Sequence, residues 1–216
     1  MTTLFNSSPS GYVIGIDEVG RGALAGPVCV GAAAIDRSCG DAPQGLTDSK
    51  CLRPLQRKQL YDPIIAWTKG CAVGCASSQE IDRWGIIVAL RLAGRRALKK
   101  LRDRGIDTGA ILLDGSHNWL ALPPRDLFMT YDHPDNDRSL PVPNQIVTQV
   151  KADQHYAVVS AASVVAKVDR DNLMCELDSG PYDWKHNKGY ASGAHIQALR
   201  EHGPSPLHRL SWKLPS

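Results

Sequence analysis

Four carboxylates stand at or just beyond the ends of apolar, strand-like stretches of the chain: Asp17, Glu18, Asp114 and Asp153. The ends of strands in a mixed α/β sheet can converge on one place. Clustered carboxylates repel one another unless a cation intervenes, and hard oxygen ligands prefer Mg²⁺ or Mn²⁺ to zinc. Acids that hold two such ions can carry out in-line phosphodiester displacement, with one ion activating water and the other stabilising the leaving 3′ oxygen. This spacing therefore favours metal-dependent phosphodiester chemistry.

The adjacent acids Asp17 and Glu18 also have a simpler interpretation, a strand end with solvated charges and an ordinary turn. Successive side chains of a strand point to opposite faces, so the two acids can serve one site only if the backbone bends there. The segment Gly20-Arg21-Gly22 follows at once. Its glycines permit a bend or a close approach, and its guanidinium suits phosphate recognition, which makes the simpler interpretation less favoured.

A mixed α/β sheet must position these residues. Apolar runs predict strands at residues 12–16, 27–35, 70–76, 110–114 and 145–150. We expect three main helices between them: one capped by Asp48 or Ser49 and ended or kinked at Pro63, one over 81–104 behind a capping box at 77–80, and one over 157–171. The Ala/Ser-rich start of the last helix predicts very close packing on the sheet.

The remaining segments are interpreted as surface. The polar face of the long helix is taken to be solvated rather than a nucleic-acid contact; it holds Arg91, Arg95, Arg96, Lys99, Lys100 and Arg102. Residues 116–144 predict a long surface loop with solvated acids at 133–137. We expect a flexible tail at 1–10, a catalytic domain over 11–180 and an irregular, partly helical appendage over 181–216.

Composition is that of an ordinary globular protein, and it excludes several classes. The 216 residues are 43% hydrophobic, and 25 Lys and Arg against 22 Asp and Glu give a net charge of +3, which is compatible with a nucleic-acid partner. The chain has no Cys-x-x-Cys, no phosphate-binding Gly-x-x-x-x-Gly-Lys motif and no Gly-x-Ser-x-Gly elbow. It shows neither a signal-peptide pattern nor an apolar run of spanning length. We therefore expect reduced thiols and a cytoplasmic protein.

The order of motifs along nearly the whole chain resembles ribonuclease HII (type 2 ribonuclease H) of the bacterial type. The matching pieces include Gly15–Gly22, Asp48-Ser49-Lys50, Leu113-Asp114-Gly115, Lys151-Ala-Asp153, Ser160–Ser163, Asn187–Tyr190 and His208-Arg209-x-Ser211. The resemblance implies a ribonuclease H-like fold, a mixed five-stranded sheet flanked by helices with a small helical C-terminal appendage that completes the substrate site. It also implies a monomeric endonuclease, active in ribonucleotide excision repair, that uses Mg²⁺ or Mn²⁺, with two ions expected.

The resemblance assigns roles to particular residues. Asp17, Glu18, Asp114 and Asp153 fall on the family's catalytic, metal-binding acids. Gly20-Arg21-Gly22 falls on its ribonucleotide-binding motif, and Tyr190 on the tyrosine that packs on the sugar of the next nucleotide. Lys50 and Lys167 are similar to substrate-backbone or site-supporting residues. The implied substrates are RNA/DNA hybrids and DNA containing ribonucleotides.

Two alternatives stay open at this point. One is a non-catalytic nucleic-acid-binding relative, although such a module has no reason to keep four repelling carboxylates. The other is a different nuclease of the same fold, such as a Holliday-junction resolvase, which would lack Gly-Arg-Gly with a distal tyrosine. The histidines have no metal-ligand spacing and are interpreted as surface or structural residues: His117, His186, His195, His202 and His208.

Overall fold

The computed structural model of the chain describes residues 6, 8, 10–124, 130, 132–143 and 145–215. Its centre is a five-stranded sheet of order β3-β2-β1-β4-β5. Strand β2 is antiparallel to both β3 and β1, whereas β1 is parallel to β4 and β4 is parallel to β5. The bounds are β1 Val13–Val19, β2 Val28–Ile35, β3 Gly70–Ala76, β4 Ala110–Asp114 and β5 Ile146–Gln149. The five expected strands and the mixed sheet are thus confirmed.

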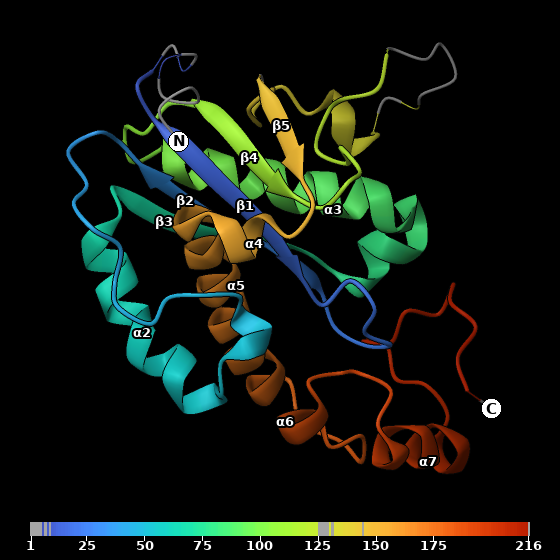
Figure 1. Cartoon of the computed structure of the whole chain (residues 1–216). Coiled ribbons are helices and arrows are strands. Elements are labelled where there is room, and N and C mark those ends of the chain that lie inside the picture. Colours follow the sequence, from blue (N-terminus) through green and yellow to red (C-terminus); the bar gives the residue numbers. More distant parts are fainter. Residues whose placement is uncertain are drawn as a thin grey trace.

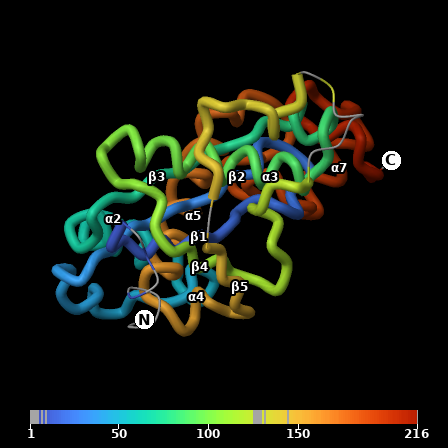
Figure 2. The backbone as a smooth tube through the Cα atoms, turned by 90° about the horizontal axis from the view of Figure 1, so that it is seen from above, coloured from blue at the N-terminus to red at the C-terminus, as the bar shows by residue number. Residues whose placement is uncertain are grey.

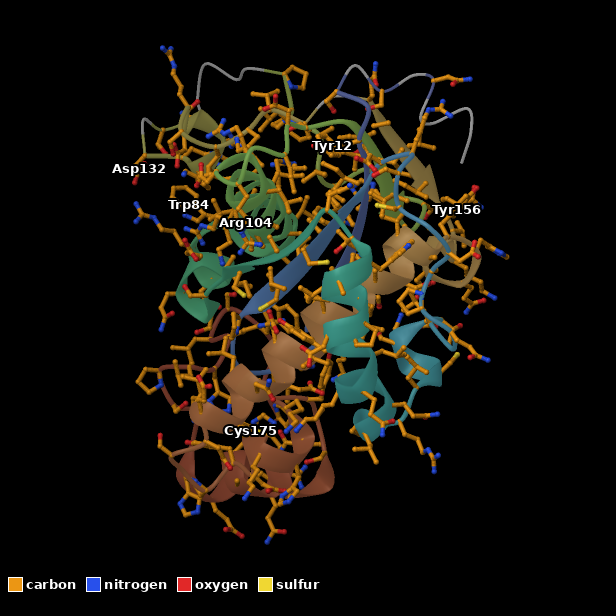
Figure 3. The ribbon with its side chains drawn as sticks, turned by 90° about the vertical axis from the view of Figure 1, so that its left-hand side faces the viewer. Tyr12, Trp84, Arg104, Asp132, Tyr156 and Cys175 are labelled. Carbon is orange, nitrogen blue, oxygen red and sulfur yellow. The ribbon has the colours of Figure 1, made fainter. Side chains whose placement is uncertain are left out.

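Helices cover both faces of the sheet (Figure 1). Helix α3 lies behind it, and α5 with α2 lies in front; Figure 3 shows Trp84 of α3 and Tyr156, just before α5, on opposite sides. The bounds are η1 Ser49–Cys51, α2 Pro54–Trp67, α3 Ser78–Arg102, η2 Pro134–Asn136, α4 Ala152–His155, α5 Ala157–Glu176, α6 Trp184–Asn187 and α7 Gly193–His202. The chain therefore forms three layers, with the sheet in the middle.

Helix α5 packs against the sheet more closely than side chains normally allow. A Cβ atom added to Gly31 of β2 would lie 2.2 Å from the carbonyl oxygen of Ala162, and one added to Gly15 of β1 would lie 2.4 Å from that of Val158. Both distances are far below ordinary contact, so only glycine fits there. The close approach expected of the Ala/Ser-rich helix is confirmed, and it brings α5 down onto the strands that carry the acids.

The C-terminal region has an apolar cluster of its own. Helices α6 and α7 lie beyond one end of the sheet, on the far side from β5 (Figures 1 and 2). The cluster joins Met174 of α5 to Tyr182, Trp184 and Leu199, and it includes Ala25 from the segment that follows β1. Burial of these side chains fixes the C-terminal region against the end of α5 and the β1–β2 connection.

Three expectations about local structure are wrong. Strand β1 continues through Val19 instead of ending before the acids. Asp48 caps only the short η1, and α2 starts separately at Pro54. Helix α2 also continues past Pro63 to Trp67, because Pro63 faces solvent, where water can satisfy the carbonyl that lost its partner.

The interpretation of the basic face of α3 as solvated is wrong for two of its arginines. Arg95 is 1% exposed and donates to the carbonyl oxygens of residues 134, 135, 137, 140 and 141. Arg91 forms a buried ion pair with Asp135, 2.6 Å apart, so that acid is not solvated either. The loop lies over this face and supplies the carbonyls that replace water.

Two expectations fall partly outside the described residues. Most of the predicted tail at 1–10 and part of the loop at 116–144 lie there, and their character stays a prediction. Among the described helices, none combines the length and apolarity needed to cross a bilayer.

Candidate functional site

Two of the predicted acids stand side by side at the carboxyl ends of parallel strands. Ile16 of β1 pairs with Leu113 of β4, so the residues that follow them, Asp17 and Asp114, come at the same level. Asp17 is 4% exposed. The amide of Glu18 donates to its Oδ1 at 2.8 Å, and Asp114 Oδ1 accepts from Ala152 N at 2.7 Å. Backbone donors therefore fix both carboxylates.

Glu18 lies on the other face of the same strand. Ile14 and Ile16 belong to the core on the α3 side, and Val13 to the core on the α5 side. Alternation then turns Asp17 toward α5 and Glu18 toward α3. The expected bend between the acids is absent, since β1 stays paired with β2 through Val19. The turn comes two residues after Glu18, at Gly20, with φ +81°.

Asp153 joins the site from the first turn of α4, which directly follows β5. Its carboxyl and that of Asp48 are close enough to shift each other's pKa, and its backbone carbonyl accepts from the Ser160 hydroxyl at 2.6 Å. Lys151 takes a left-handed conformation, φ +57°, that turns the chain from the strand into α4. Asp48, matched earlier only as part of a motif and as a cap, is thus a fifth acid at this site.

Burial and mutual repulsion both act on the carboxylates of the cluster. Burial raises the pKa of Asp17 to about 7, repulsion from Glu18 and Asp114 adds to the rise, and a hydrogen bond from Ser163 opposes it. Burial also raises the pKa of Glu18 and of Asp153, in each case with repulsion from Asp114. The carboxylates therefore stand in a place that favours a cation or a proton.

Lys50 supplies positive charge at this site. Burial by itself would lower the pKa of its ammonium group, but the surrounding acids raise it. Those acids are Asp17, Asp48, Asp153 and Asp114. The predicted residue Lys50 is therefore brought to the acids, from the short helix η1 that Asp48 caps.

The donor chemistry fits a hard divalent cation, because it consists of carboxylate oxygens that repel one another. Within the described ranges, however, no three His, Cys, Asp or Glu side chains are arranged closely enough to hold a metal ion. The structure thus brings the acids into one electrostatic neighbourhood without closing a ligand set. The negative charge of these acids is the observation that favours binding of a cation.

The Gly20-Arg21-Gly22 segment and Tyr190 meet beside the acids. Gly20 N donates to the Tyr190 hydroxyl at 3.1 Å, and Arg21 Nη1 lies 3.4 Å from Glu18 Oε1. Two cations of α5 lie near the Tyr190 ring, with Lys167 Nζ 5.9 Å and the Arg170 guanidinium 5.5 Å from its centroid. Lys167 is thus placed at the tyrosine and pairs with Asp171 at 2.6 Å; Lys50, not Lys167, is the lysine at the acids.

Sequence reasoning missed two buried arginines below this segment. Both are 0% exposed; Arg170 donates to the backbone carbonyls of Ala25 and Pro27, and Arg209 donates to those of Gly20 and Gly26. Arg209 stands in one of the matched motifs, but an arginine in a sequence carries no sign that its side chain is buried. Their partners are carbonyl oxygens, which every residue has, so no spacing rule indicates the contact.

Solved structures with this arrangement define the fold class. A ribonuclease H2 from Pyrococcus horikoshii OT3 matches with TM-score 0.60 and 24% identity, over 94% of this chain and 95% of its own. A chain in the PCNA:RNase HII complex from Archaeoglobus fulgidus matches with TM-score 0.65 and 23% identity over the same shares. Bst-RNase HIII in complex with Mn²⁺ matches with TM-score 0.68 and 22% identity, over 98% of this chain and 70% of its own. The protein therefore has a ribonuclease H-like fold.

Sequence comparison identifies the family within that class. The family model for ribonuclease HII matches residues 14–215. Ribonuclease HII of Streptomyces griseus is 44% identical over 93% of this chain and 76% of its own length, and that of Acaryochloris marina is 40% identical over 94% and 93%. The chain belongs to the ribonuclease HII family, and it is a ribonuclease H. The resemblance stated from its motifs is confirmed.

Proposed function

We propose that this ribonuclease H cleaves the RNA strand of RNA/DNA hybrids and incises duplex DNA on the 5′ side of a single embedded ribonucleotide. The observation that carries the proposal is the 3.1 Å contact between the Tyr190 hydroxyl and the Gly20 amide. It holds an aromatic ring against the segment that directly follows the two acids of β1. A group bound by that segment would therefore lie next to the reacting phosphate.

We assign Asp17, Glu18, Asp114 and Asp153 as the catalytic acids that bind Mg²⁺ or Mn²⁺, with two ions as the expected number. Support comes from the raised pKa values of Asp17, Glu18 and Asp153, and from the Mn²⁺ in the Bst-RNase HIII structure. Such ions supply Lewis-acid activation of water and stabilisation of the leaving oxygen. The chain's own part is to fix the carboxylates through backbone donors and to balance their charge with Lys50.

Gly20 and Gly22 differ in a way that supports substrate contact by the loop. Gly20 has φ +81°, and a Cβ there would lie 2.1 Å from Arg170 Nε, so its glycine is required by the protein itself. Gly22 has an ordinary φ and nothing within 4 Å of a built Cβ. Nothing within the chain requires glycine at position 22, and the close approach of a ribose to the backbone would explain why glycine stands there. A 2′-hydroxyl within reach of the loop distinguishes RNA from DNA.

Tyr190 completes the proposed recognition of the junction. It is 36% exposed, so part of its ring is free to stack on the sugar of the following deoxynucleotide, where a 2′-hydroxyl would fit poorly. Lys167 and Arg21 are assigned to the substrate backbone. In this assignment residues 181–216 complete the substrate site of a catalytic domain at 11–180, and the enzyme acts as a monomer in ribonucleotide excision repair.

A cleavage assay tests the proposal. A 5′-labelled DNA duplex with one ribonucleotide is incubated with the wild-type protein in Mg²⁺, in Mn²⁺ and in EDTA, beside an RNA/DNA hybrid and an all-DNA duplex. We expect cleavage of the single-ribonucleotide duplex and of the hybrid only with metal, and none of the all-DNA duplex. Cleavage of the hybrid alone would contradict the junction assignment, and full activity in EDTA would contradict the metal assignment.

A further inference from the structure

We infer that Arg209 is a positioning residue that orients the peptide N–H groups of the Gly20-Arg21-Gly22 loop toward the substrate. The inference rests on the proposed function, because it specifies how that loop would recognise a ribose. Its basis is a set of contacts between the C-terminal segment and the loop, which lie almost the whole length of the chain apart in sequence.

The Arg209 guanidinium binds the carbonyl oxygens of the loop from below. It donates from Nη2 to Gly20 O at 2.6 Å and from Nη1 to Arg21 O at 2.7 Å, and from Nε and Nη2 to Gly26 O, both at 3.2 Å. The side chain is fully buried, and within the described part of the chain no carboxylate lies within ion-pair distance of it. Burial lowers its pKa to about 10, so it stays charged at neutral pH.

These carbonyl contacts also fix the direction of the neighbouring N–H groups, because the peptide group is planar. In a trans peptide the carbonyl of one residue and the N–H of the next point in opposite directions. Since the carbonyls of Gly20 and Arg21 point at Arg209, the N–H groups of Arg21 and Gly22 point away from it. Both residues are exposed, and the hydrogen bonds found among the described residues leave these two donors without an acceptor. Two adjacent N–H donors therefore face outward beside the acids.

A second contact fixes the segment that carries Arg209. Asp82 of α3 accepts from Leu210 N and Ser211 N, each at 2.9 Å, and from the Ser211 hydroxyl at 2.6 Å. Arg209 N donates to Leu24 O at 2.9 Å, and its guanidinium packs 4.7 Å from the Trp212 ring centroid. The segment 208–212 is thus held between α3 and the loop, and Asp82 positions Arg209 without touching the loop itself.

Substitution of Arg209 by Lys tests the inference. A lysine keeps the charge but lacks the planar fork that reaches three carbonyls at once. The measurement is the Kd, in EDTA by fluorescence anisotropy, of a duplex with one ribonucleotide and of the same all-DNA duplex. We expect the wild type to favour the ribonucleotide and Arg209→Lys to lose about fivefold or more of that preference, the scale of one hydrogen bond. The kcat/KM for incision should fall by about tenfold or more.

Arg95→Lys is the matched control. Arg95 is another fully buried arginine on carbonyl oxygens, but its acceptors belong to residues 134–141 and not to the loop that follows Asp17 and Glu18. It should lose thermal stability like Arg209→Lys while keeping the wild-type preference and kcat/KM. Asp82→Asn should reduce the preference for the ribonucleotide duplex, as Arg209→Lys does. If Arg209→Lys fails to fold, Asp82→Asn is the variant that tests the inference.

The outcomes separate this inference from the proposed function. A folded Arg209→Lys with the wild-type preference, or an Asp82→Asn with the wild-type preference where Arg209→Lys does not fold, would overturn it. A wild type that incises the single ribonucleotide yet binds both duplexes equally would also overturn it, while leaving the proposed activity in place. A wild type that never incises that substrate would refute the proposed function instead.

Discussion

At the scale of single residues, the main feature is a set of carboxylates held where the protein alone does not neutralise them. Burial raises the pKa of Asp17 to about 7, whereas Asp135, whose side chain is 5% exposed, is paired with Arg91 at 2.6 Å. The type and order of the strand-end acids could be predicted from the sequence. Asp48 was missed as a member because its position before a helix already has a capping explanation.

Asp17→Asn should abolish cleavage and raise the stability of the metal-free protein. Because the folded-state pKa is raised from 3.8 to about 7, the carboxylate destabilises the fold progressively above pH 3.8, so its removal stabilises at pH 8, by up to about 4 kcal/mol. Thermal unfolding in EDTA measures this. Asp135→Asn is the control, since it breaks a buried pair and should lower the Tm. Equal losses of stability in both variants would count against the charged cluster.

Two glycine variants should separate an effect on substrate binding from an effect on folding: Gly22→Ala tests the first and Gly20→Ala the second. Gly20→Ala places a methyl group on Arg170 at a positive φ and should cost about 1–3 kcal/mol of unfolding free energy. Gly22→Ala should unfold like the wild type but lose kcat/KM by about tenfold. Urea unfolding and single-ribonucleotide cleavage measure the two effects. Wild-type activity in Gly22→Ala would contradict close approach at that residue.

At the scale of elements, the sheet was predictable because its strands are continuous apolar runs of small and β-branched residues. It was harder to predict which faces of the helices are exposed to solvent. Arg91 and Arg95 have the pattern of a solvated helix face, yet the loop that follows β4 covers them and supplies carbonyl acceptors. Helix periodicity reports which residues can share a face, whereas a long-range loop decides whether that face meets water.

Gly31→Ala should disrupt the contact between β2 and α5. The added Cβ would lie 2.2 Å from a backbone oxygen of α5, and backbone cannot swing aside as a side chain can. We expect a loss of about 2–3 kcal/mol in the unfolding free energy. Gly40→Ala, where a built Cβ meets nothing within 4 Å, is the control and should change it little. A neutral Gly31→Ala would mean that the helix does not pack as closely as described.

At the scale of the whole molecule, the C-terminal region and the first loop interlock. Their contacts join residues far apart in sequence through backbone carbonyls, so no local pattern could reveal them. Two buried histidines lie in this region. His195 Nδ1 donates to Tyr190 O at 2.9 Å, which leaves its Nε2 to accept from His208 Nε2 at 2.9 Å. Both rings must be neutral for this chain of bonds to form.

Stability should therefore fall between pH 7 and pH 5 in part because of His208. Burial lowers the folded-state pKa of His208 to about 4, so below about pH 6.5 the unfolded chain binds a proton that the folded chain does not. That one group should cost about 2 kcal/mol at pH 5. Urea unfolding of wild type and His208→Gln at both pH values isolates it, because the variant should lose less stability on acidification. Equal losses in the two proteins would contradict the neutral pair.

The ends of the cleavage product test the central claim most directly. A duplex with one ribonucleotide, labelled on each side of it in turn, is cut by the wild type in Mg²⁺, and the new ends are identified by mass. Attack of water held at the acids predicts a 3′-hydroxyl on the DNA and a 5′-phosphate on the ribonucleotide. A cut on the 3′ side of the ribonucleotide that leaves a 2′,3′-cyclic phosphate would mean that the 2′-hydroxyl is the nucleophile, and it would contradict the assignment of Asp17, Glu18, Asp114 and Asp153.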